Sequence, residues 1–144
     1  MKFLFTIDPG IPLKYSDTLL DITAYLNDPD GWGILFVPCK ENPDFHIRLS
    51  SDSTITKICG LPSGLSCAEL GGKHMYLNFD RWMHGSAKSG LDLANYRQYM
   101  VSHEVGHILG HEHVKCPGRG NPAPIMMQQT LGIQNCKPNT KIHK

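Results

Sequence analysis

The sequence predicts a small α+β fold that forms one domain over residues 1–144. A chain of this length suits a single hydrophobic core and is too short for a second one. The first 80 residues contain several short strand-like runs and one helical segment. A long helical pattern then begins at Asp92, and an irregular tail rich in glycine and proline follows it.

The first half of the chain contains strands on either side of one helix. Lys2–Ile7 reads as the first strand. Ser16 or Asp17 is expected to cap the helix, and Asn27–Gly31 to end it. The apolar positions that we expect on its buried face are Leu19, Leu20, Ile22, Ala24 and Leu26. Two further strands are predicted at Gly33–Val37 and Phe45–Leu49.

The second half begins with a glycine-rich excursion over residues 57–73 that contains two cysteines. Lys73–Asp80 then alternates as a strand, with Met75, Leu77 and Phe79 on one side. We expect Ser66–Glu69 to pair with it as a hairpin around Gly71 and Gly72, and to form an edge of the sheet. In the long helix, Leu93, Tyr96, Met100, His103 and His107 form one stripe that faces the core.

Composition and charge argue against several functions. The formal net charge is +1 and no basic cluster stands out, so we expect no nucleic-acid partner. No segment reaches the roughly 18 apolar residues that span a membrane. Asp8–Gly10 interrupts the short apolar N-terminal run, so we expect neither an export signal nor a pro-segment. We expect a monomer.

The chemistry of the chain is concentrated in residues 103–113, which read His-Glu-Val-Gly-His-Ile-Leu-Gly-His-Glu-His. His103 and His107 lie four residues apart, on one face of a helix, and can bind one metal ion. Gly110 permits a positive-φ turn that returns His113 as a third ligand. Three imidazoles with one open position are typical of a catalytic zinc site, in which Glu104 reaches a water on the ion as general base.

This pattern resembles the H-E-x-x-H-x-x-G-x-x-H signature of the metzincin metallopeptidases. A candidate Met-turn follows at Pro122–Gln128, with Met126 favoured over Met127 as the methionine beneath the ligands. The resemblance implies one Zn²⁺ ion, a mixed twisted sheet and hydrolysis of peptide bonds in a peptide or protein substrate. The tyrosine that follows the Met-turn methionine in some metzincins is absent, because Gln128, Gln129 and Thr130 stand there.

A closer resemblance runs from about residue 28 to residue 139. Segments such as Tyr96–Tyr99, Cys116–Gly120 and Pro122–Met126 look like a bacterial family of small, mostly secreted, metzincin-like domains. That family has no assigned function. It therefore adds no substrate.

The chain has five cysteines, so at least one is unpaired within it. The pairing that we prefer, and that the closer resemblance favours, joins Cys59 to Cys67 and Cys116 to Cys136 and leaves Cys39 free. This pattern favours secretion or another oxidising compartment, and the alternative is that all five are reduced.

We expect the remaining histidine and aromatic side chains near the motif to have structural rather than chemical roles. His111 is expected to face solvent, Tyr96 and Tyr99 to pack, and Trp32 and Trp82 to lie in the core or at its rim. Two alternatives to a zinc endopeptidase remain. One is a zinc-containing binding module with little or no proteolysis, and the other is a zinc hydrolase of a non-peptide amide or ester.

Overall fold

The protein is described by a computed structural model, which covers residues 1–142. Its strands are β1 (Lys2–Ile7), β2 (Val37–Pro38), β3 (Phe45–Ser50), β4 (Cys67–Ala68) and β5 (His74–Asn78). Its α-helices are α1 (Tyr15–Leu26), α2 (Asp52–Cys59), α3 (Phe79–His84) and α4 (Leu93–Ile108). Two short 3-10 helices, η1 (Ala87–Ser89) and η2 (Gln129–Leu131), complete the fold.

The strands form one mixed sheet in the order β2-β1-β3-β5-β4. All neighbours are parallel except β4, which is antiparallel to β5 and lies at the edge. Cys67 faces Tyr76 and Ala68 faces Met75, so the hairpin expected around Gly71 and Gly72 is confirmed. The α+β class and the mixed sheet are confirmed with it.

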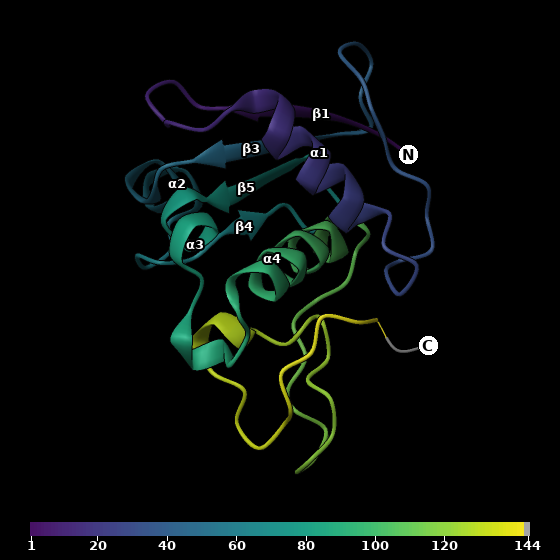
Figure 1. The fold of residues 1–144 in the computed structure, drawn as a ribbon, viewed down its shortest axis with the longest axis vertical. Coiled ribbons are helices and arrows are strands. Elements are labelled where there is room, and N and C mark those ends of the chain that lie inside the picture. Colours follow the sequence, from purple (N-terminus) through teal and green to yellow (C-terminus); the bar gives the residue numbers. More distant parts are fainter. Residues whose placement is uncertain (143–144) are drawn as a thin grey trace.

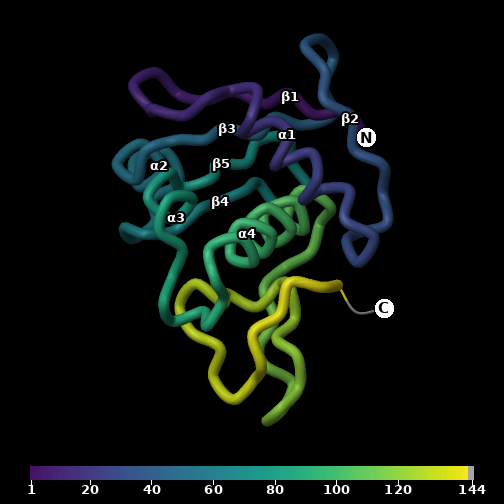
Figure 2. Tube along the Cα trace, viewed as in Figure 1, coloured from purple at the N-terminus to yellow at the C-terminus, as the bar shows by residue number. Residues whose placement is uncertain are grey.

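The core lies between the sheet and the two longest helices. Alternate strand residues point toward the helices because successive side chains of a strand face opposite sides. On β1, Phe3 and Phe5 are almost fully buried, and they join Ile22 of α1 and Val101 of α4 in one apolar cluster. Helix α4 lies between the sheet and the irregular C-terminal segment (Figure 1). The same layering is visible in the chain trace (Figure 2). Within residues 1–142, no helix is long and apolar enough to cross a membrane.

Helix α1 differs from the prediction at its start and on its buried face. Its N-cap is Lys14, which has no side-chain hydrogen bond, so neither Ser16 nor Asp17 caps the helix. Both of them lie inside the first turn. The buried residues are Thr18, Ile22 and Leu26, and they repeat every four residues as one narrow stripe. Leu20 and Ala24 fall off this stripe and are exposed, while Leu19 is half-buried.

The predicted strand at Gly33–Val37 is also wrong for most of its length, because only Val37 belongs to β2. Gly33 has a φ of 74°, which is incompatible with an extended strand. The side chain of Asn27 then takes both backbone groups of Phe36: its Oδ1 accepts from Phe36 N at 2.8 Å, and its Nδ2 donates to Phe36 O at 2.9 Å. These groups are therefore not available for a ladder.

Helices α2 and α3 were not predicted. Ser51 caps α2 by accepting from Thr54 N at 3.2 Å, and Asn78 caps α3 by accepting from Arg81 N at 3.2 Å. The cap at Asn78 ends β5 there, so Phe79 and Asp80 belong to a helix and not to the predicted strand.

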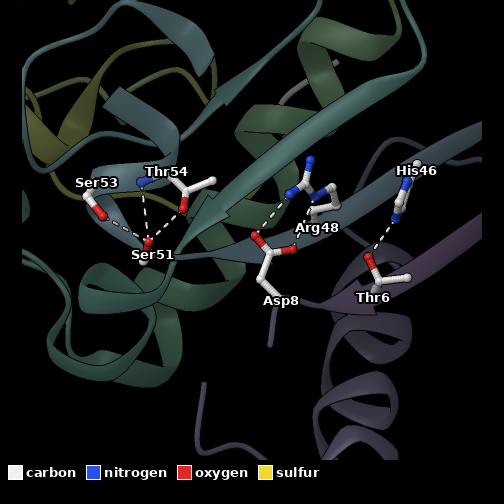
Figure 3. A network of polar contacts seen from close by, with 7 residues as sticks. All are labelled: Thr6, Asp8, His46, Arg48, Ser51, Ser53 and Thr54. Carbon is white, nitrogen blue, oxygen red and sulfur yellow. Dashed lines mark hydrogen bonds and ion pairs between the residues drawn. The ribbon is translucent and has the colours of Figure 1, made fainter. Parts of the chain in front are cut away.

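Polar contacts join the ends of the central strands on the face opposite the core (Figure 3). Arg48 of β3 forms an ion pair with Asp8 at 3.0 Å, just after β1. His46 and Thr6 form a hydrogen bond of 2.6 Å between the same two strands. These contacts fix the register of β1 against β3.

Candidate functional site

Helix α4 presents the first three residues of the motif. Asp92 caps it, as predicted, by accepting from Asn95 N at 2.8 Å. The helix ends at Ile108, and Gly110 leaves it with a φ of 96°, the turn that the sequence predicted. Backbone bonds then hold the returning segment, since His111 N donates to Gly106 O at 2.9 Å and Val114 N donates to Met126 O at 3.1 Å.

This turn brings the three motif histidines together. His113 Nε2 lies 3.3 Å from His103 Nε2 and 3.0 Å from His107 Nε2. One ring nitrogen from each residue lies within 4.8 Å of the others, and the group could hold a metal ion. Among residues 1–142 it is the one such group of three or more histidine, cysteine or acidic residues.

The opposite ring nitrogens are occupied by backbone carbonyls. His103 Nδ1 lies 2.7 Å from Ile125 O, and His107 Nδ1 lies 2.8 Å from His111 O. A carbonyl oxygen only accepts, so each Nδ1 donates and, in the neutral ring, leaves Nε2 with a free lone pair. Two lone pairs therefore point to the position where His113 Nε2 arrives. This donor set fits a metal ion, because ligating histidines usually donate their other nitrogen to such an acceptor.

Burial favours the neutral form of all three rings. It lowers the pKa of His103 to about 3 and also lowers the pKa values of His107 and His113. Neutral imidazole is the form that binds a metal. Burial has the opposite effect on Glu104, where it raises the pKa of the carboxyl group to about 8.

A cavity of about 550 Å³ opens over the histidines and Glu104. One wall comes from the segment that leads into β4, and the other from α4 and the residues after the Met-turn candidate. Its side chains are Leu61, Leu65, Ser66, Cys67, Ala68, Leu70, Tyr96, Tyr99, Met100, His103, Glu104, His107, Glu112, His113, Gln128 and Thr130. The lining is therefore mixed: leucine and aromatic side chains share it with the three histidines and two acidic side chains, Glu104 and Glu112.

The two adjacent methionines point into different surroundings. Met126 belongs to the main core, and its side chain packs on α4 at Gly106, between the two helical histidines. Met127 instead packs with Ala123 and Cys136 in a small separate cluster. Tyr99 fixes this turn, because its hydroxyl donates to Met127 O at 3.1 Å and accepts from Gln129 N at 2.9 Å. Packing alone was expected of Tyr99.

Trp32 and His111 form a contact that the sequence did not indicate. The two rings stack with centroids 4.6 Å apart and planes 15° apart. The Trp32 indole Nε1 also donates to Ser102 O, at 2.9 Å, next to His103 in the chain. His111 is exposed, as expected, but it is not free of contacts. No sequence signal links two residues that lie so far apart in the chain.

The cysteines pair as predicted. Cys59 is bonded to Cys67 and Cys116 to Cys136, while Cys39 is free. The first bond spans the loop that carries Leu61 and Leu65, so it restrains one wall of the cavity. The second bond encloses the segment that contains Met126.

Comparisons with known proteins identify a family and a similar fold. A family model described as "Protein of unknown function (DUF3152)" matches residues 11–143. No curated protein matches the chain. Among solved structures, archaemetzincin from Methanopyrus kandleri is similar, with 16% sequence identity and a TM-score of 0.59. The match covers 96% of this chain and 88% of that chain. The fold is therefore a small α+β domain similar to that of archaemetzincin.

Proposed function

This chain belongs to the family described as a protein of unknown function, DUF3152, and we propose that it is a zinc-dependent metallopeptidase. The observation that carries the proposal is the convergence of three imidazoles beside a buried glutamate, in a cavity bounded by an edge strand. The likeness of the fold to that of archaemetzincin supports it.

The proposed ligands are Nε2 atoms of His103, His107 and His113. Structural zinc sites are closed by four protein ligands, usually with cysteine among them, whereas catalytic sites have three and an open position. The three histidines fit the second type, and both disulfides lie outside the set. Zn²⁺ bound there would act as a Lewis acid toward the scissile carbonyl and lower the pKa of the attacking water.

Glu104 is the proposed general base. Its raised pKa belongs to the metal-free chain, and a cation held by the neighbouring histidines would favour the carboxylate form. The carboxylate takes one proton from the attacking water as the water oxygen bonds to the carbonyl carbon. It then gives that proton to the amide nitrogen as the carbon–nitrogen bond breaks, and the amine leaves.

Strand β4 is the proposed docking edge for the substrate. It lies at the border of the sheet, and Cys67 and Ala68 both line the cavity. An extended peptide adds to such an edge through main-chain hydrogen bonds. Leu61, Leu65 and Leu70 offer apolar contacts to its side chains along the same wall.

Met126, rather than Met127, is the proposed apolar floor beneath the ligands. Its packing on α4 at Gly106 supports this choice, because Gly106 lies between Glu104 and His107 in the chain.

The test combines metal analysis with hydrolysis of a quenched peptide library. We expect one zinc ion per chain in the wild type and in Glu104→Ala, and none in His107→Ala. Hydrolysis is expected in the wild type alone of these three and is lost on chelation. His84→Ala and Glu41→Ala are matched controls, since both residues are exposed and neither lines the cavity.

Two outcomes would contradict the proposal. Cleavage by Glu104→Ala at the wild-type rate would exclude this residue as the base. Stoichiometric zinc without cleavage of any peptide would instead favour a metal-containing binding module.

A further inference from the structure

Trp32 lies outside helix α4 but contacts residues next to the candidate metal ligands. It lies in the irregular segment between α1 and β2, and it is half-buried. Its indole Nε1 donates to Ser102 O at 2.9 Å. Its ring packs directly on the α4 backbone, because a Cβ atom at Gly106 would lie 2.8 Å from the indole Cζ2. Two contacts therefore fix this ring against α4 on both sides of Glu104 in the sequence.

The same indole stacks on His111. The rings are nearly parallel, with planes 15° apart and centroids separated by 4.6 Å. Stacked aromatic pairs of this kind contribute about 0.5–1.5 kcal/mol beyond the area that they bury. His111 is exposed, so the indole is the aromatic partner that restrains its side chain.

The backbone of His111 is the point where this restraint reaches the metal ligands. Its carbonyl accepts from His107 Nδ1 at 2.8 Å, and this bond sets the ring orientation and the tautomer of His107. His113 follows only two residues later. A shift of His111 would therefore move the acceptor of one ligand and the backbone of another.

We propose that Trp32 is a positioning residue for the metal centre. Its indole is bonded to Ser102 O and stacked on His111. It thereby holds residues 109–113 in the position that brings His113 to His103 and His107. The inference rests on the proposed zinc site. It adds a residue outside the motif on which the affinity of that site depends.

The test measures zinc affinity by competition with a chromophoric chelator, and the visible absorption of the Co²⁺-substituted protein. Trp32→Ala is expected to weaken zinc binding by about 10–100-fold, the usual effect of losing a residue that supports a ligand. Trp32→Phe retains a ring but loses the N–H group, so we expect its zinc affinity to lie between those of the wild type and Trp32→Ala. An altered Co²⁺ spectrum is expected in Trp32→Ala, because the ligands no longer hold the same geometry.

His111→Ala tests whether the stacked ring, rather than the backbone carbonyl of His111, is needed for zinc affinity. It removes the stacked ring but keeps the backbone carbonyl that accepts from His107. We expect weaker zinc binding here too. The double variant with Trp32→Ala should bind within about threefold of Trp32→Ala alone, because both changes break the same contact.

Trp82→Phe is the matched control. Trp82 is buried in the main core and does not line the cavity over the histidines. Its substitution should lower the free energy of unfolding of the chelated protein and leave zinc affinity unchanged. All affinities are compared under conditions in which the chelated variants are folded.

Wild-type zinc affinity and an unchanged Co²⁺ spectrum in Trp32→Ala and His111→Ala would overturn the inference. An equal loss in Trp82→Phe and Trp32→Phe would do the same. If Trp32→Ala does not fold, Trp32→Phe and His111→Ala decide the matter. Failure of the wild type to bind zinc would instead refute the proposed function.

Discussion

Replacing Gly106 with alanine tests how tightly helix α4 packs on Met126, the proposed floor of the site. A Cβ atom at this position would overlap Sδ of Met126 and would lie 2.8 Å from Cζ2 of Trp32 and 3.2 Å from Cε of Met126. Real Cβ atoms do not approach other atoms so closely, so at least two side chains must move. Trp32 resists this movement because its indole is bonded to Ser102 O.

The expected change is the difference of two opposing effects. Overpacking of a core site costs about 1–3 kcal/mol, and two contacts this short favour the upper end. Alanine is better than glycine inside a helix by about 1 kcal/mol. We therefore expect Gly106→Ala to lower the free energy of unfolding by about 2 kcal/mol, measured by urea unfolding with a chelator present. Zinc affinity should fall as well if Met126 forms the proposed floor, because the substitution displaces its side chain.

The variant Met126→Ala isolates the cause. Alone it should cost about 2–5 kcal/mol, as for other large-to-small changes in a core. In that background Gly106→Ala keeps only the close approach to Trp32. The better helix propensity of alanine offsets this remaining cost, so the substitution should cost close to nothing, which gives a coupling energy above about 1 kcal/mol. The reasoning fails if Gly106→Ala is as stable as the wild type, or if the two substitutions are additive.

Three further predictions concern ionisation, metal binding and the cavity wall. Burial in the folded chain raises the pKa of Glu104 from 4.5 to about 8. The protonated side chain therefore stabilises the chelated protein fully below pH 4.5, and this stabilisation is lost as the pH rises toward 8. Glu104→Gln should therefore gain on the order of 4 kcal/mol relative to the wild type between pH 5 and pH 8 in urea unfolding, and an equal pH slope in both proteins would contradict this. Excess zinc should raise the melting temperature of the wild type and of Glu104→Gln but leave that of His107→Ala unchanged in a thermal scan, since ligands stabilise only the form that binds them. Asp52 accepts from Ser63 Oγ at 2.6 Å and from Gly64 N at 2.7 Å, so Asp52→Ala should speed proteolysis within residues 60–66. An unchanged cleavage rate would show that these two bonds do not restrain the loop.

Sequence reasoning predicted the parts of the fold that local patterns determine. Short strand-like runs located β1 and β3, alternation located β5, and Asp92 located the start of α4. Its failures arose where one side chain redirected the backbone. Asn27 binds the backbone of Phe36 and prevents a longer β2, and Ser51 and Asn78 start helices in segments that were read as loop and strand.

The candidate site also contains features that local sequence patterns predict and features that they do not. The spacing of His103, His107 and His113 was sufficient to predict their convergence, because helix geometry and one glycine turn produce it. The contacts of Trp32 and Tyr99 were not predictable, since they depend on packing between segments that are distant in the chain. Such contacts have no local sequence pattern.

The two disulfides restrain the walls of the cavity rather than the main core. The main core, from Phe3 to Met126, contains none of the bonded cysteines. The Cys59–Cys67 bond restrains the segment that leads into β4, and the Cys116–Cys136 bond restrains the irregular segment after α4. Oxidation therefore acts on the walls of the cleft more than on the framework behind it. A reduced chain would keep a folded scaffold and its histidines, but the two sides of the cavity would be less restrained.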